Sequence, residues 1–460
     1  MDSGKCFFLC FGFRSLTFLR LESPIGEYIY VLDLSSFRVC GYEPRHAAVM
    51  GWFQEKTPLP GRNGRLTYEV DLCPRTILRR VVECVPSSSS SSHTLSSSAN
   101  HPPRKAKNEL NLSFLIGVES EFILLKQTNP TIEAVNNHGW SNSPALPSGS
   151  LEAKVLEEIA DVLNATGIEL QMYHAEAAPG QYEVVTGPLG PLQAADALVH
   201  TRETIYNVAS KYGLRATFAP RVYMDSCTSP PPLYLFPLYL TKITNTGGSA
   251  AHTHISIHSS PSSSSSSTSI HSSPSPPSSP SSSTSSPNLT SLESSFLAGI
   301  LAHLPSLTIL TLPLSASYKR MVDGAWSGGT YVCWGTDNRE APIRLCNATS
   351  PASRNFEVKC VDGTSNPYVA FAGLIAAGVE GVKTNRVLEV RDCSAQGEGR
   401  TAAEMGEEER VRCGIMERLP LSWEEAREAF RGDGVLGEVF GEAFVGGYLN
   451  VNKVRFFFCD

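Results

Sequence analysis

Two glutamates stand one residue apart in the segment 117–122, inside an apolar run that continues on both sides. Apolar flanks of this length predict a buried strand, and residues i and i+2 of a strand point to the same face. Glu119 and Glu121 are therefore expected side by side in a core. Paired like charges are costly there unless a cation neutralises them. A divalent cation with oxygen ligands is the simplest solution.

Three further segments supply the same kinds of ligand, either in short predicted strands or beside a Pro-Gly turn. The candidate ligands that they add are Glu176, Glu183, His252, His254 and Glu357. An isolated E-x-E is more often a solvated strand edge than a ligand pair, but four such segments in one chain favour a site. Carboxylates with a minority of imidazoles suit a hard cation such as Mg2+ or Mn2+.

With these residues the chain resembles the glutamine synthetase family, in the glutamine synthetase-like branch found in fungi. The resemblance runs from about Leu72 to about Phe456, apart from Ser-rich inserts. The shared motifs are GVESEF at 117–122, HAEAAPGQYE at 174–183, GGS at 247–249 leading to HTH at 252–254, SYKR at 317–320, WGTDNR at 334–339 and NPY at 366–368. The E-x-x-P-G-Q-x-E and G-S-x-x-H-x-H patterns are the specific ones, and the common order of all six identifies the family.

The resemblance implies an α+β catalytic domain in which a curved antiparallel sheet, backed by helices, surrounds a site for two divalent ions, Mg2+ or Mn2+. One ion is expected at Glu121, Glu176 and Glu183. The other, in contact with the phosphates of ATP, is expected at Glu119, His252 and Glu357. ATP would phosphorylate the γ-carboxylate of glutamate, and ammonium or an amine would then displace phosphate to form an amide.

The same resemblance assigns the remaining site residues. Arg320 is expected to bind the substrate carboxylate, and Gly248 to let the backbone approach the substrate. The nucleotide is expected to contact His254, Ser256, Arg339 and Arg344, with guanidinium forks on the phosphates. For His254 a purely structural role is nearly as well supported.

Several positions depart from the family pattern. The flap glutamate that binds ammonium in glutamine-forming enzymes is replaced by Trp326, and the arginine expected beyond the metal-binding Glu357 is Lys359. A second expected arginine is Asn355, an expected asparagine is Gly247, and the ammonium-binding aspartate of the N-terminal domain has no identifiable counterpart. An indole can stack on a larger amine or a cation but cannot deprotonate ammonium. The metal and phosphate residues are thus kept, whereas the ammonium residues are not.

Composition sets further bounds. The net charge of −7 gives no basic footprint for nucleic acid. Twelve cysteines without a C-x-x-C pair predict free thiols in a reducing, cytoplasmic location. No apolar run reaches the roughly 18 residues of a membrane span, and the apolar residues near the start are expected to be a strand or a mis-assigned start rather than a signal peptide.

The expected organisation is a truncated, β-rich N-terminal unit at 1–85, a disordered Ser-rich linker at 86–108, and a catalytic domain at 109–460. A disordered Ser/Pro-rich insert is expected at 259–287 within that domain. Whether residues 1–24 are genuine protein is left open. A homo-oligomer is expected if the N-terminal unit is complete enough, because active sites of this family form between subunits.

Three functions stay open at this stage. The first is an ATP-dependent ligase that forms glutamine or, as Trp326 favours, a γ-glutamyl amide of a larger amine. The second is a catalytically silent structural or developmental signalling protein, favoured by the truncated N-terminal unit and the Ser tracts. The third is a phosphotransferase to a guanidino group, to which Lys359 gives slight support. Retention of all six metal-ligand candidates separates the two enzymes from the silent protein.

Overall fold

The structure is a computed structural model, and it describes residues 27–61, 64–83, 112–138, 142–222, 248–259, 289–324, 327–394 and 401–459. Sequence predictions on the following residues lie outside these ranges: residues 1–24, the linker 86–108, Gly247, the insert from residue 260 onward, and Trp326. Ser259, the first residue of the predicted insert, is instead the last residue of a strand.

A nine-stranded sheet forms the centre of the molecule. Its strands are β4 (Leu112–Gln127), β5 (Glu133–Ala134), β6 (Leu170–Ala175), β7 (Gln181–Leu189), β8 (Arg215–Thr217), β9 (Thr253–Ser259), β10 (Trp334–Thr336), β11 (Ile343–Cys346) and β12 (Asn355–Val358). The order is β10-β11-β12-β9-β4-β7-β6, with β5 and β8 also paired to β4. Every pair is antiparallel except β10 with β11. The predicted α+β fold with a mostly antiparallel sheet is confirmed.

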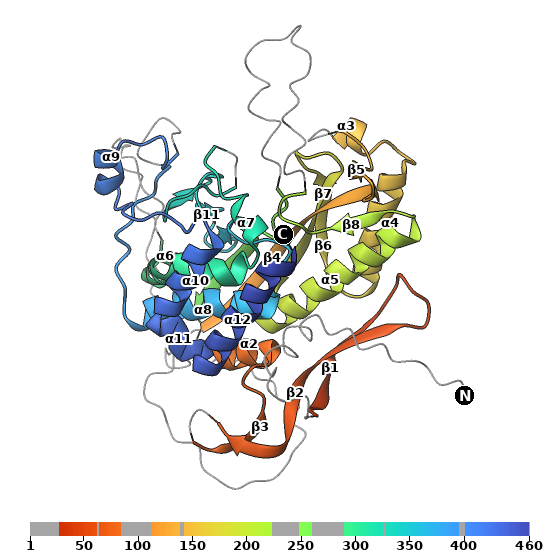
Figure 1. Cartoon of the computed structure of the whole chain (residues 1–460). Helices are drawn as coiled ribbons and strands as arrows, with labels where there is room; N and C mark the ends of the chain where they lie inside the picture. The colour runs from red at the N-terminus through yellow and green to blue at the C-terminus, as the bar shows by residue number, and fades with distance from the viewer. Residues whose placement is uncertain are drawn as a thin grey trace, which may run out of the picture.

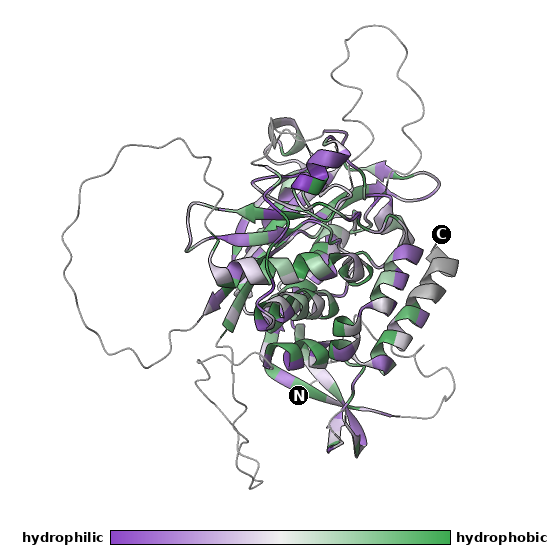
Figure 2. Cartoon of the chain, turned by 90° about the vertical axis from the view of Figure 1, so that its left-hand side faces the viewer, coloured by the Kyte–Doolittle hydropathy of each residue, from purple (hydrophilic) through white to green (hydrophobic). Residues whose placement is uncertain are grey.

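The longer helices lie together on one side of this sheet, whereas α9 lies apart at its periphery (Figure 1). The helices of this part of the chain are α3 (Asn142–Ala145), α4 (Leu151–Ala165), α5 (Pro191–Lys211), α6 (Ser291–Thr311), α7 (Ser315–Tyr318), α8 (Pro367–Lys383), α9 (Glu407–Arg412), α10 (Trp423–Gly432), α11 (Gly434–Phe440) and α12 (Glu442–Cys459). Figure 2 shows the apolar residues gathered along the central strands and helices and the hydrophilic ones toward the periphery.

Strand β4 carries two kinds of residue on its two faces. Its even-numbered positions, such as Phe114, Ile116 and Phe122, are buried in the hydrophobic core. Glu119 and Glu121 occupy odd positions and point to the opposite face. Strand alternation therefore separates the core from the acidic side chains, as the sequence predicts.

Helix α6 lies within the core. A capping box at Thr290 and Glu293 starts it, and close contact with α8 leaves no room for a side chain at Gly299, where an added Cβ would lie 2.3 Å from the Ala377 carbonyl oxygen. Among the described residues, α6 is the one helix long and apolar enough to cross a membrane, so the expectation that no such segment exists was too strict. Most of it is buried against the rest of the protein, as in the core helix of a soluble fold.

A separate three-stranded sheet precedes the large sheet and its helices in the chain and extends below them in Figure 1. It consists of β1 (Ile29–Val39), β2 (Ala47–Pro60) and β3 (Leu66–Glu69), and is followed by α2 (Pro74–Glu83). Strand β2 was not predicted from the sequence.

Helix α2 connects this small sheet to the helices α5 and α8 through one buried arginine. The Arg75 guanidinium donates to Asp33 of β1 at 2.6 Å and to both carboxylate oxygens of Asp196 of α5 at 3.0 and 2.8 Å. The Tyr368 hydroxyl of α8 donates to Asp196 at 2.7 Å. One buried network thus joins β1, α2, α5 and α8.

Candidate active site

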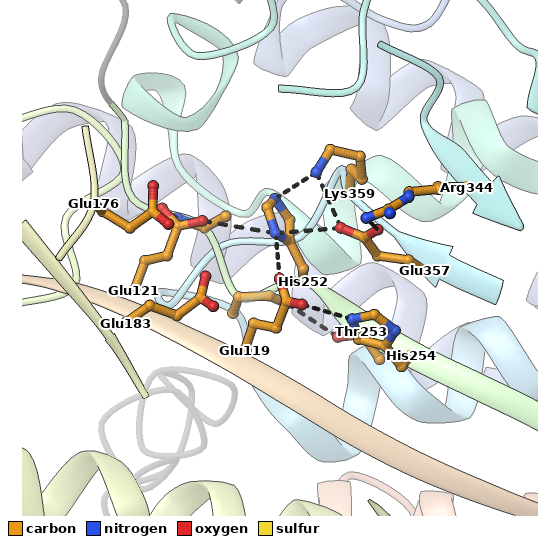
Figure 3. Close-up of polar contacts among 12 residues, drawn as sticks. Glu119, Glu121, Glu176, Glu183, His252, Thr253, His254, Arg344, Glu357 and Lys359 are labelled. Atoms are coloured by element: carbon orange, nitrogen blue, oxygen red, sulfur yellow. Dashed lines mark hydrogen bonds and ion pairs between the residues drawn. The ribbon is translucent and has the colours of Figure 1, made fainter. Parts of the chain in front are cut away.

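The sheet brings the candidate ligands together from five strand segments on one face (Figure 3). Glu121 of β4 is directly opposite Glu183 of β7, and Glu183 is in turn opposite His174 of β6. On the other side, Glu357 of β12 is opposite His254 of β9. Because these pairs are antiparallel neighbours, their side chains project into a common space.

The first cluster contains three carboxylates and one imidazole. His174 lies with Nε2 3.1 Å from a Glu183 oxygen and Nδ1 3.5 Å from a Glu176 oxygen. Glu121 is held differently, because one of its oxygens accepts from Gln181 Nε2 and from the Ala250 backbone N–H, each at 3.0 Å. These neutral donors fix the Glu121 carboxylate without cancelling its charge.

Burial and mutual repulsion perturb the acids of this cluster. Burial, then the charges of Glu183 and Glu176, raise the pKa of Glu121 well above its ordinary value. Burial, with repulsion from Glu119 and Glu176, outweighs the hydrogen bond from His174 and raises the pKa of Glu183 to about 7. Buried carboxylates with raised pKa values are stabilised when a proton or another cation binds between them.

The second cluster surrounds Glu119. His252 Nδ1 is 2.9 Å from one Glu119 oxygen, and His254 Nε2 is 3.0 Å from the other. His252 Nδ1 also lies 3.5 Å from Glu357 and 3.7 Å from Glu121, so this imidazole borders both clusters. His254 Nδ1 donates to the Asn355 side-chain oxygen at 2.8 Å, which gives Asn355 a positioning role.

The two imidazoles of the second cluster are shifted in opposite directions. Burial and the Lys359 ammonium outweigh the attraction of Glu119 and lower the pKa of His252 to about 4. For His254, burial is outweighed by hydrogen bonds to Cys346 and Glu119, and the pKa lies well above its ordinary value. These shifts favour the neutral form of His252 and the protonated form of His254.

Three basic side chains border the second cluster. Lys359 Nζ donates to one Glu357 oxygen at 3.0 Å, and Arg344 donates to the other at 3.2 Å. Although burial opposes it, the attraction of His252 and Lys359 lowers the pKa of Glu357 to about 2. Arg320 is buried, and one of its terminal nitrogens donates to the Lys359 carbonyl and approaches His252 Nε2. The other terminal nitrogen, Nη1, has no hydrogen-bond partner in the described part of the chain.

The remaining predicted site residues lie less close to this centre. The Gly248 carbonyl accepts from Gln181 Nε2 at 3.1 Å, next to the Glu121 contact. Ser256 hydroxyl pairs with His258 at 2.9 Å rather than with the clusters. Arg339 is exposed in the segment after β10, and no hydrogen bond or ion pair joins its side chain to another described residue. The structure therefore unites the metal candidates with Arg320, Arg344 and Lys359, but not with Arg339 or Ser256.

The donor set fits a divalent metal ion. Among the described residues, three sets of ligand atoms lie within 4.8 Å of one another: Glu119, Glu183 and His252; Glu119, His254 and Glu357; and His174, Glu176 and Glu183. The sets differ from the predicted grouping, because Glu119 links both sides and Glu121 belongs to none of them. His174 was missed from the sequence, although it stands two residues before Glu176, the spacing already used for Glu119 and Glu121.

Comparison with known proteins agrees with this geometry. The family model described as "Glutamine synthetase, catalytic domain" matches residues 103–230 and 239–456. The chain is 33% identical to Protein fluG of Emericella nidulans over 96% of its own length, but it spans only 42% of that protein. It is 29% identical to the gamma-glutamylpolyamine synthetase GlnA3 of Streptomyces coelicolor, covering 92% of this chain and 75% of the relative.

Solved structures with the same fold include a GmaS/ADP complex, with a TM-score of 0.65 and 20% identity, covering 95% of this chain and 84% of the other. A structure described as a novel glutamine synthase homolog gives a TM-score of 0.63 at 22% identity, covering 94% and 81%.

Proposed function

The chain belongs to the glutamine synthetase catalytic-domain family, and we propose that it is an ATP-dependent carboxylate–amine ligase. Its product would be glutamine or a γ-glutamyl amide, formed through γ-glutamyl phosphate. The observation that carries this proposal is the meeting of five glutamates and three basic side chains on one face of the sheet. Acidic residues suit metal ions, and the adjacent cations suit the anionic substrates.

Two divalent ions, Mg2+ or Mn2+, would be held by Glu121, Glu176 and Glu183 and by Glu119, His252 and Glu357. When bound, such ions neutralise the charge of a transferring phosphoryl group.

The protein's own cations would position the two anionic substrates. The unpartnered Nη1 of buried Arg320 offers a donor for the glutamate carboxylate. Arg344 presents a guanidinium at the edge of the second cluster, where nucleotide phosphates would lie, and exposed Arg339 could approach them from the segment after β10. His254 and Ser256 would face the nucleotide. Orientation and charge neutralisation of this kind carry most of the catalysis in phosphoryl transfer.

The preferred amine is expected to be larger than ammonium. Trp326 replaces the carboxylate that would hold ammonium, and an indole face is worth about 0.5 to 2 kcal/mol to a cation. Lys359, in place of an arginine, is committed to Glu357 and has little free donor capacity for substrate. The name of the Streptomyces coelicolor relative, a gamma-glutamylpolyamine synthetase, supports an alkyl amine, diamine or polyamine.

A catalytically silent role is the second candidate. Lys359 and Arg344 already neutralise Glu357, so the second cluster is partly satisfied without an ion.

We further propose a cytoplasmic protein that assembles as a homo-oligomer, with the small sheet and α2 as its N-terminal unit and the catalytic domain after it.

Turnover tests the choice between these functions. The purified full chain is incubated with ATP, Mg2+ or Mn2+, glutamate and a panel of amines, and phosphate release and product mass are followed. We expect amide formation that Glu121→Ala abolishes and that Glu157→Ala, an exposed acid on α4, leaves unchanged. No amide with any amine would favour the silent protein. An ammonium kcat/KM tenfold or more above that of the alkyl amines, about 1.4 kcal/mol in transition-state binding, would instead indicate a glutamine-forming enzyme.

A further inference from the structure

We propose that His174 is a ligand of the first divalent ion, together with Glu176 and Glu183, and that its nitrogen makes this site prefer Mn2+ to Mg2+. The inference rests on the proposed function only in assuming that a divalent ion binds this cluster. It adds a residue that lies outside the ligand set expected from the family.

The position of His174 is fixed by the sheet. It is on β6 directly opposite Glu183 of β7, so the two side chains share one face. Its Nε2 lies 3.1 Å from a Glu183 oxygen, and the ligand atoms of His174, Glu176 and Glu183 lie within 4.8 Å of one another. A single ion can therefore contact all three groups after small side-chain adjustments.

The orientation of the ring is that of a metal-binding histidine. His174 Nδ1 lies 3.1 Å from the Ala175 carbonyl oxygen, which can only accept, so Nδ1 carries a hydrogen. The other nitrogen, Nε2, faces an oxygen of Glu183 at 3.1 Å, so in the ion-free protein it donates to that carboxylate, and a bound ion would take the place of the Nε2 hydrogen. Metal-binding histidines commonly donate their second ring N–H to a backbone carbonyl or carboxylate, which fixes the tautomer that offers its lone pair to the ion.

Glu121, by comparison, has less freedom to bind an ion. One of its two oxygens already accepts from Gln181 and from the Ala250 backbone, and it belongs to none of the three compact ligand sets in the described residues. His174 thus supplies a donor on the side of the cluster away from Glu121.

A nitrogen ligand changes the choice of metal. Mg2+ keeps to oxygen ligands and near-ideal octahedral geometry, whereas imidazole raises the affinity for transition-metal ions. Mn2+ accepts both carboxylate and imidazole, so a site of two glutamates and one histidine discriminates in its favour. The competing role for His174 is that of a counter-ion, which would leave when the metal enters.

Metal binding without ATP, glutamate or amine tests the proposal. The chelator-treated full chain is titrated with Mn2+ and separately with Mg2+ by calorimetry, as wild type, His174→Gln and His258→Gln. His258 is a matched control because it lies on β9 of the same sheet and pairs with Ser256 rather than with a carboxylate. Electron spin-echo spectroscopy of bound Mn2+ measures its coupling to ligand nitrogen, and circular dichroism confirms the fold of each variant.

We expect His174→Gln to weaken Mn2+ binding by about tenfold or more, to change Mg2+ binding much less, and to remove one nitrogen coupling. His258→Gln should change none of these. Unchanged nitrogen coupling in His174→Gln, equal weakening of both metals, or tighter binding in the variant would overturn the proposal. The spectrum of Mn2+ bound to the wild type adds a test that needs no mutation, because the absence of any nitrogen coupled to Mn2+ would also refute the proposal. Failure of the ligase assay leaves these results unaffected, so the two proposals can fail separately.

Discussion

Replacing Glu121 by glutamine should stabilise the ion-free protein while abolishing its activity. The Glu121 carboxylate lies directly across from Glu183 between β4 and β7. Cross-strand partners have Cβ atoms about 5 Å apart, and two unit charges at that distance repel by about 3 kcal/mol at an effective dielectric constant of ~20. A glutamine oxygen can still accept from Gln181 and Ala250, so the substitution removes the charge and keeps the hydrogen bonds.

The free energy of unfolding that Glu121→Gln adds should depend on pH in a defined direction. Because the pKa of Glu121 is higher in the folded protein than in the unfolded chain, ionisation of this carboxyl opposes folding above its unfolded pKa. The free-energy cost of this ionisation to the folded protein grows with pH until the folded-state pKa of Glu121 is reached. The advantage of Glu121→Gln should therefore be small near pH 5 and larger at pH 8, where we expect about 1 to 3 kcal/mol, or a Tm rise of about 2 to 5 °C.

Differential scanning calorimetry of chelator-treated protein at several pH values measures this. Glu157→Gln is the control, because an exposed acid should change stability by no more than about 0.5 kcal/mol. Addition of Mn2+ should then raise the Tm of the wild type more than that of Glu121→Gln, which lacks the charge that attracts the ion. A Tm that falls in Glu121→Gln at pH 8, or a gain that is the same at all pH values, would refute the reasoning about repulsion.

Three further outcomes are expected. Gly248→Ala should raise the KM for glutamate and lower the Tm, because the added Cβ would lie 2.6 Å from a backbone oxygen. The control Gly437→Ala should change neither the KM nor the Tm, because no atom lies within 4 Å of its added Cβ. His303→Gln should lower the Tm at pH 6 and have less effect at pH 9. The hydrogen bond to Asp433 raises the pKa of His303 in the folded protein. The stabilisation that protonated His303 contributes is therefore complete below the pKa of the unfolded chain and is lost as the pH rises through the folded-state pKa. Thr290→Ala should cost about 1 kcal/mol by removing the α6 cap, seen as a lower midpoint in thermal unfolding, and an unchanged midpoint would contradict that role.

Much of the site was predictable because strands impose a period of two. The spacing of Glu119 and Glu121 was enough to place both on one face, and β4 confirms it. His252 and His254 follow the same rule at the start of β9, and both contact Glu119.

What the sequence could not reveal depends on how strands pair and where long side chains point. The contact of His174 with Glu183 exists because β6 and β7 pair across the turn 176–180 in a register that places these two residues opposite each other. The engagement of Lys359 with Glu357 similarly depends on the direction of a long, flexible side chain in a buried space. Strand β2 was missed because its first half, although strand-forming, is followed by a polar stretch without clean alternation.

The Arg75 network makes the unfolding of the two sheets cooperative. If the small sheet and α2 detached alone, Asp196 would lose its charged partner while remaining buried between α5 and α8, and breaking a buried pair in this way costs about 3 to 5 kcal/mol. Local opening of the first strands is therefore coupled to loosening of the helical layer behind the candidate active site. Amide hydrogens in α2 and α5 should consequently exchange with solvent at similar rates, although these helices lie more than a hundred residues apart in the chain.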